Sequence, residues 1–209
     1  MAITNGYCTL AELQTNLDPT AKITWTADQD ANQEIAIEAA SRWIDYQTNM
    51  RFYSASETRV YTAPFGDWLP LEDGITSVTT LKTDDDNDGT YETTWATTDY
   101  VLEPVNAAVK GEPYRRIRID RQTGTNTFPR VRDGVQLVAT FGYSTTVPPA
   151  IKQATLLLSN RLWRRKDAIF GVAGSAAIGG VQTVIARIKT DADVMELLNG
   201  VNRQRLFFA

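Results

Sequence analysis

The hydrophobic and polar positions change their period twice along the chain. In residues 9–52 the apolar side chains recur every three or four residues, as they do on one face of a helix. A first stripe consists of Leu10, Leu13 and Leu17. Thr9 stands just before it and Glu12 follows three residues later, which is the spacing of a capping box. We therefore predict a short helix that ends at Asp18.

A second, longer helix is predicted from about Asp28 to Thr48. Its expected core stripe is Ile35, Ala39, Trp43 and Tyr46. Its expected solvent side is Glu34, Glu38, Arg42 and Asp45. At ~1.5 Å per residue this helix is about 30 Å long, enough to be a main strut of the fold.

Residues 58–145 have the pattern of β-structure. Short runs rich in β-branched or aromatic residues are bounded by Gly, Pro, Asn or Asp at 58–63, 78–81, 91–95, 100–102, 116–119 and 135–140. We expect five to six antiparallel strands, because parallel pairs need crossover helices for which there is no room. Arg116 and Arg118 alternate with Ile117 and Ile119, which predicts one wet and one buried face.

The third zone returns to helix. A helix is expected to start at Pro148-Pro149, with a stripe of Ile151, Ala154, Leu158 and Leu162. The glycine-rich stretch 170–180 predicts a loop, and 181–188 a strand or an extended arm. A last helix is expected to be capped by Asp191 or Asp193 and to end at Gly200.

These zones together predict an α+β fold. Residues 1–57 and 146–200 form a small helical-bundle core, and residues 58–145 form an inserted antiparallel β domain. Residues 201–209 form a C-terminal tail.

The composition removes several kinds of chemistry. The 209 residues include no histidine and one cysteine, Cys8, which excludes His-based nucleophile systems, His-ligated zinc and an intramolecular disulfide. We find no catalytic constellation, and we expect neither enzymatic activity nor a cofactor. No apolar run approaches the ~20 residues that span a bilayer, and the first ten residues lack the pattern of a signal peptide. We expect a soluble protein made in a reducing cytoplasm.

The net charge of -4 conceals an asymmetry. Residues 1–149 carry 12 basic and 21 acidic side chains, whereas residues 150–209 carry 9 and 4. A basic cluster stands near the end of the helix that begins at Pro148-Pro149: Arg161, Arg164, Arg165 and Lys166. It forms either a solvated helix face or a contact with other subunits. Because the sequence pI is about 4.9, protein partners fit this chain better than specific DNA binding.

One acidic segment resembles the first half of a calcium loop. Asp84, Asp86 and Asp88 alternate and are followed by Gly89. An EF-hand loop closes with a glutamate at about its twelfth position, which here is Trp95. We therefore favour a polar hairpin tip and no metal site, and we keep a weak calcium site as the alternative.

The C-terminal tail is a candidate partner-binding segment. It consists of Arg203 and Arg205 leading into Leu206, Phe207 and Phe208. Two adjacent aromatic rings can each bury ~150–250 Å², so they serve either as an anchor in a partner's pocket or as part of the protein's own core.

The order of these features resembles the head–tail connector proteins of tailed bacteriophages. The resemblance lies in three segments: Thr9 to Leu13; Ala39 to Phe52, with Ile44-Asp45, Thr48 and Arg51-Phe52; and Phe141-Gly142-Tyr143 followed by Val147-Pro148, Ile151, Ala154, Leu158, Arg161, Arg165, Asp167-Ala168 and Phe170-Gly171. They cover both helical zones, a little over half of the chain. The β zone 58–145 is much larger than in small members of the family.

The resemblance implies a structural virion protein of the neck, assembled in the host cytoplasm. Its partners would be a homo-oligomeric ring of about twelve copies, the portal protein and a tail or stopper protein. Genome DNA would pass through the lumen without specific binding, and no membrane is involved. The alternatives are a calcium-dependent β-module that binds a surface or a carbohydrate, suggested by Asp84 to Asp88, and an enzyme that acts through carboxylates alone.

Overall fold

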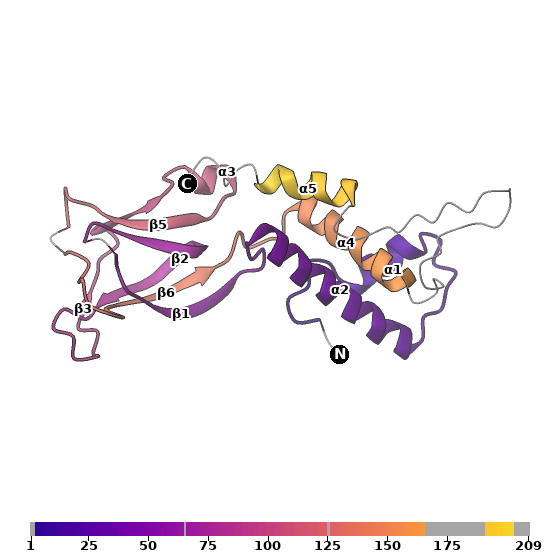
Figure 1. Ribbon diagram of the computed structural model, residues 1–209, viewed down its shortest axis with the longest axis horizontal. Helices are drawn as coiled ribbons and strands as arrows, with labels where there is room; N and C mark the ends of the chain where they lie inside the picture. The colour runs from indigo at the N-terminus through magenta and orange to yellow at the C-terminus, as the bar shows by residue number, and fades with distance from the viewer. Residues whose placement is uncertain (1–2, 65, 125, 166–190, 203–209) are drawn as a thin grey trace. The chain divides into compact units, whose positions relative to one another are not determined.

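The chain divides into two compact units. The computed structural model describes residues 3–64, 66–124, 126–165 and 191–202. One unit comprises Met1–Asn49 with Val147–Ala209, and the other comprises Met50–Thr146 (Figure 1). The first is helical and the second contains an antiparallel sheet, so the predicted α+β fold is confirmed.

The helical unit contains α1 (Leu10–Leu17), α2 (Ala27–Thr48), α4 (Pro149–Arg164) and α5 (Ala192–Asn202). α4 contacts each of the other three, and Figure 1 shows α2 and α5 alongside it. The predicted capping box is present, because the Thr9 N–H donates to Glu12 at 3.0 Å and the Glu12 N–H donates to the Thr9 hydroxyl at 3.2 Å.

Two local predictions at helix ends have different outcomes. Asp191 caps α5 as expected, since its Oδ1 accepts from the N–H of Val194 at 3.4 Å. The predicted stop at Gly200 is wrong, because α5 continues to Asn202. A single glycine within a helix costs only about 1 kcal/mol, which packing of Leu198 and Val201 can outweigh.

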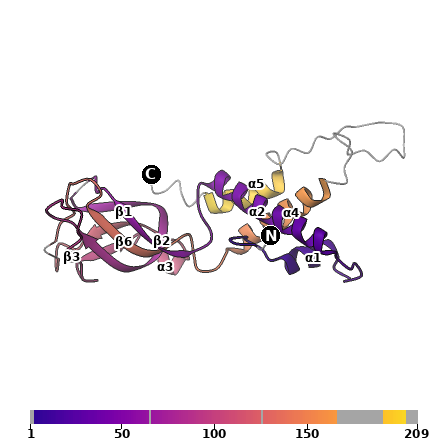
Figure 2. The same ribbon diagram turned by 90° about the horizontal axis from the view of Figure 1, so that it is seen from below.

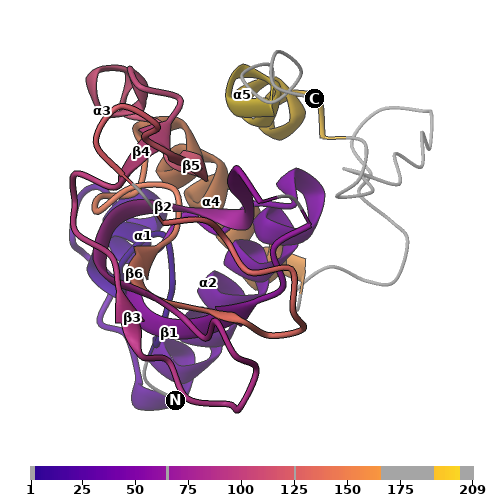
Figure 3. The ribbon, with the colours of Figure 1, turned by 90° about the vertical axis from the view of Figure 1, so that its left-hand side faces the viewer.

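The second unit contains β1 (Ala55–Tyr61), β2 (Trp68–Thr83), β3 (Thr93–Thr94), β4 (Tyr100–Glu103), α3 (Ala107–Lys110), β5 (Tyr114–Ile119) and β6 (Val135–Phe141). The sheet order is β1-β6-β2-β5-β4, with β3 paired to β2, and all pairs are antiparallel. Figure 2 shows β1, β6 and β2 side by side, and Figure 3 shows β4 and β5 next to α3, which connects them in sequence.

The long strand β2 was only partly predicted. It spans 16 residues and pairs with both β5 and β6, whereas the pattern indicated only 78–81. The run before Gly74 contains Pro70 and two acidic residues, which is typical of a turn. In the structure Gly74 has φ of 71° and lies where the β2–β5 register shifts between Pro70 and Ile75, so the strand continues through a bulge.

The sheet buries its own apolar core. Thirteen buried residues form it: Ala63, Leu69, Leu71, Ile75, Leu81, Trp95, Ile117, Ile119, Phe128, Val135, Leu137, Ala139 and Phe141. On β5 the alternation is as predicted, with Ile117 and Ile119 buried, and the arginines Arg116 and Arg118 pair with Glu103 on β4. Within the described part of the chain, no helix has the length and apolar character needed to cross a membrane.

Candidate interaction surfaces

The outward face of α2 carries the apolar residues that the sequence assigned to the core. Ile35 is 53% exposed and Tyr46 is 82% exposed, and Ala39 between them is exposed as well. The buried positions are instead Gln33, Ala36, Ile37, Ala40, Ser41, Ile44 and Thr48. At about 100° per residue, the three exposed residues lie on the opposite side of the helix from Ile37 and Ile44. The predicted core stripe was therefore wrong at these three positions, whereas its fourth residue, Trp43, is half-buried. We call Ile35, Ala39 and Tyr46 the α2 stripe.

The inversion has a physical reason in the residues that face inward. Ser41 and Thr48 are polar, but each hydroxyl donates to a carbonyl one turn earlier, at 2.8 Å, on Ile37 and Ile44 respectively. Hydroxyls satisfied in this way can be buried at little cost. Ala36 and Ala40 add no bulk, so α2 can approach its neighbours closely through a face whose pattern looks polar.

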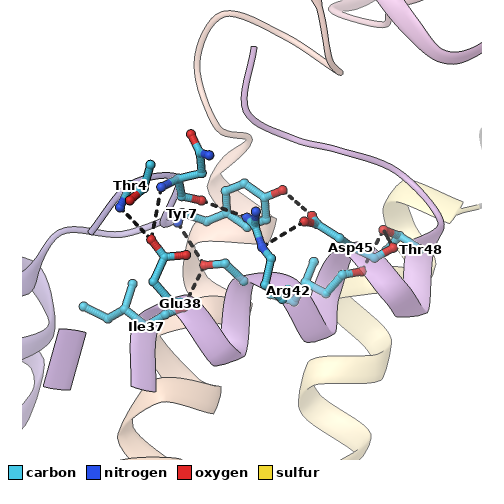
Figure 4. Close-up of polar contacts among 10 residues, drawn as sticks. Thr4, Tyr7, Ile37, Glu38, Arg42, Asp45 and Thr48 are labelled. Carbon is cyan, nitrogen blue, oxygen red and sulfur yellow. Dashed lines mark hydrogen bonds and ion pairs between the residues drawn. The ribbon is translucent and has the colours of Figure 1, made fainter. Parts of the chain in front are cut away.

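Three residues of the predicted solvent side of α2, Glu38, Arg42 and Asp45, contact the N-terminal segment (Figure 4). The Glu38 carboxylate accepts from the N–H groups of Thr4 and Asn5, at 2.6 and 3.1 Å. The hydroxyl of Ser41 accepts from the N–H of Tyr7 at 3.1 Å. The carboxylate of one helix residue thus satisfies two backbone donors of a segment more than thirty residues away in sequence.

Arg42 and Asp45 continue this contact along the helix. The Tyr7 hydroxyl donates to the Asp45 carboxylate, and Arg42 Nε lies 3.2 Å from the same carboxylate. Arg42 also donates to the Asn5 carbonyl at 2.9 Å, and its guanidinium carbon lies 5.6 Å from the centroid of the Tyr7 ring. Sequence reasoning missed this contact because charged helix residues look the same whether they face water or a peptide backbone.

A groove of about 530 Å³ lies between α1 and α4. It is lined by Ala11, Glu12, Thr15, Asn16, Pro19, Lys152 and Leu156. An ion pair between Lys152 and Glu12 crosses from one helix to the other. Partial burial would raise the pKa of Glu12, but the hydrogen bonds from Lys152 and Thr9 outweigh it and hold the pKa below its usual value. We call this the α1–α4 groove.

Cys8 lies under the same helices and is buried. Burial, followed by the nearby charge of Glu12, raises the pKa of its thiol to about 12, against the opposing effects of Lys152 and Ser159. Such a thiol stays protonated and unreactive at neutral pH.

The basic cluster on α4 is partly engaged within the chain. Arg161 forms ion pairs with Asp191 and, at 3.9 Å, with Asp193, which links α4 to the start of α5. Arg164 and Arg165 are exposed. Lys166 lies outside the described residues, as do the tail residues Arg203, Arg205, Leu206, Phe207 and Phe208 and the predicted loop and strand or arm of 170–188.

The three aspartates of the acidic segment lie together at the tip of the β2–β3 hairpin. A carboxylate oxygen from each of Asp84, Asp86 and Asp88 lies within 4.8 Å of the others. The two oxygens of Asp84 accept from the N–H groups of Asn87 and Gly89, at 2.6 and 2.9 Å, so this buried carboxylate holds the turn. Asp86 and Asp88 are exposed. The hydrogen bonds to Asp84 fit the hairpin interpretation and the grouped carboxylates fit the calcium alternative, so the absence of a metal site stays a prediction.

The sheet carries a charge chain that the sequence did not indicate. Glu57 pairs with Arg51 and Arg59, both at 2.7 Å, and Arg59 also pairs with Asp73 at 2.7 Å. The Arg59 guanidinium lies 4.1 Å from the centroid of the Phe141 ring. Partial burial opposes the charge on Glu57, but hydrogen bonds from Arg59 and Arg51 hold its pKa below the usual value. This charge chain links β1 to β2 across the intervening strand β6.

Comparison with known proteins identifies structural likeness only. No family model and no curated protein matches the sequence. Solved structures of gene transfer agent particles contain chains of similar fold. A chain in the neck of an empty particle in C6 symmetry and a chain in the native virion each align with a TM-score of 0.58 and 21% identity, over 96% of this chain and 91% of theirs. A chain in the neck of the native particle in C12 symmetry aligns with a TM-score of 0.52 and 20% identity, over 94% of this chain and 91% of that one. The shared fold therefore includes both the helices and the sheet.

Proposed function

We propose that this chain is a structural neck protein of a phage-like particle. It forms a ring of about twelve copies that joins the portal to the tail and surrounds the DNA channel. The observation that carries the proposal is the alignment of 96% of the chain, sheet included, with chains of gene transfer agent necks. This likeness agrees with the resemblance to head–tail connectors, which rests mainly on the two helical zones.

The helical unit supports a ring because its surfaces differ from one another. A closed ring requires each subunit to present two different, complementary faces. The α2 stripe is an outward apolar ridge, and the α1–α4 groove is a depression on a different pair of helices. Exposed apolar side chains grouped on one helix face are typical of surfaces that become buried in an assembly.

Three further roles belong to the same proposal. Arg164, Arg165 and Lys166 contact neighbouring subunits, whereas Arg161 also serves its own chain through Asp191. The segment Arg203 to Phe208 anchors the ring to the portal, with arginines for steering and aromatic rings for burial. The lumen does not grip the passing DNA, because many Lys/Arg–phosphate contacts would resist sliding.

The test is the location and number of copies in purified particles. An epitope-tagged chain should be incorporated, and electron microscopy of labelled particles should place it at the single vertex where the tail attaches. Quantitative mass spectrometry should give about twelve copies per particle, the number in the proposed ring. Label spread over the capsid surface, or particles with no copies of the chain, would refute the proposal.

A further inference from the structure

We infer that the α2 stripe of one copy docks into the α1–α4 groove of the next copy. The inference rests on the proposed ring and names the surfaces that close it. Its starting observation is that α2 turns its apolar stripe away from its own unit, with Tyr46 82% exposed. A tyrosine ring at the centre of an interface is among the side chains that contribute most to binding, because it buries a large area at low entropic cost.

The charges of the two helices favour a head-to-tail contact. α2 carries five acidic side chains against one basic side chain, Arg42: Asp28, Asp30, Glu34, Glu38 and Asp45. Glu38 and Asp45 already bind the N-terminal segment and Arg42, so the net negative charge of α2 is concentrated in its N-terminal half. α4 carries Lys152, Arg161 and Arg164 and has no acidic residue. Lys152 and Arg161 also pair with Glu12 and Asp191 of their own chain, and Arg164 is exposed. Packing α2 of one copy on α4 of another brings opposite charges together. Packing α2 on α2 across a two-fold axis would bring two helices of net negative charge together, which is unfavourable.

The spacing of the exposed positions suits packing against helices. Asn32, Ile35, Ala39, Arg42 and Tyr46 are exposed, at alternating intervals of three and four residues. Such spacing forms a straight ridge that fits between two other helices. The floor of the groove includes the half-buried Leu156, and its rim includes the exposed residues Thr15 and Pro19. A ridge with small Ala39 at its middle can approach a groove closely while Ile35 and Tyr46 insert on either side.

The experiment cross-links the two surfaces within purified particles. The variant Thr15→Cys/Tyr46→Cys and its two single variants are incorporated and treated with a short bis-maleimide. The native Cys8 is buried and should not react. We expect the double variant to give a ladder of multiples of the chain, and the single variants to stay as single chains. Two-fold packing of α2 on α2 would instead cross-link Tyr46→Cys alone as a dimer, which would overturn the inference.

A second readout separates this contact from the ring itself. We expect Ile35→Asp/Tyr46→Asp to reduce the copies per particle at least tenfold without changing the melting temperature, because both side chains are exposed. Val109→Asp is the matched control, since Val109 is 89% exposed in the sheet unit and should load normally.

The possible failures differ from one another. If the wild-type chain is found on particles but the double cysteine variant gives no ladder, the docking inference is overturned and the proposed ring is unaffected. Poor loading of the stripe variant without a ladder shows that the stripe binds another partner, such as the portal, which also overturns it. Absence of wild-type chain from particles refutes the proposed function and the inference with it.

Discussion

Replacing Asp84 by alanine should destabilise the sheet unit, because this carboxylate organises the β2–β3 turn. Asp84 is 4% exposed, and its two oxygens accept from the N–H groups of Asn87 and Gly89 at 2.6 and 2.9 Å. A hydrogen bond to a charged group contributes about 1.5–3 kcal/mol. Asn87 and Gly89 are exposed, so their N–H groups can recover bonds to water, and we expect a loss of about 2–3 kcal/mol in total rather than the full sum of two bonds.

The loss should be felt beyond the turn. The Asp84 N–H donates to the Gly134 carbonyl at 3.0 Å, and the neighbouring Thr83 hydroxyl accepts from the Trp95 indole N–H at 3.1 Å. Trp95 stacks on Phe128 with ring centroids 4.7 Å apart, inside the sheet core. Loosening the turn therefore also weakens the hydrogen bonds and ring contact that join the hairpin to the sheet core.

Urea denaturation followed by circular dichroism measures the effect. Asp86→Ala is the matched control, because Asp86 is exposed in the same turn, and its effect should stay within about 0.5 kcal/mol. Equal effects of the two substitutions would refute the argument. So would a rise of several degrees in the melting temperature of the wild-type protein at micromolar calcium that Asp84→Ala abolishes, because a ligand stabilises the state that binds it.

Four further predictions concern other parts of the chain. At pH 8 iodoacetamide should alkylate the native Cys8, whose pKa is raised to about 12, at least about a hundredfold more slowly than the urea-unfolded chain; equal rates would contradict its burial. Ser41→Ala removes the acceptor of the buried Tyr7 N–H and should lower the free energy of unfolding in urea by about 1–3 kcal/mol, against about 0.5 kcal/mol for Thr15→Ala at an exposed position of α1. Equal effects of the two substitutions would argue against the N-terminal contact. The isolated protein should show no submicromolar, salt-sensitive binding to duplex DNA in fluorescence anisotropy; such binding would contradict a lumen that does not grip the genome. Deleting 203–209 should leave the melting temperature nearly unchanged and abolish co-sedimentation with tailless, DNA-filled heads; an early melt would place the tail in the core, and retained binding would place the portal contact elsewhere.

The features that sequence predicted well are those set by neighbours along the chain. The capping box at Thr9 and the cap at Asp191 depend on residues three positions apart, so the pattern contains all that determines them. The alternation on β5 follows in the same way from the two-residue period of a strand. The α+β division followed because the hydrophobic period itself changes between the zones.

The features that sequence missed depend on contacts between distant residues. The groove joins Thr15 of α1 to Lys152 of α4, and the charge chain joins Arg59 to Asp73 on another strand. A pattern of single residues cannot show which of several carboxylates meets which arginine. The β2 strand was shortened for a related reason, because the sheet neighbours on both sides outweigh the local turn signal at Gly74.

The inverted faces of α2 connect the sequence to the proposed assembly. Periodicity identifies an apolar stripe but not the surface that covers it, and we assigned the stripe to the chain's own core by default. The core face of α2 succeeds without large apolar residues because Ser41 and Thr48 satisfy their hydroxyls within the helix. The apolar residues Ile35 and Tyr46 are thus not needed for the fold of the single chain. A stripe that the fold does not use and that water disfavours is typical of a surface that binds another molecule, and the opposite net charge of α4 supports our inference that this molecule is a second copy of the chain.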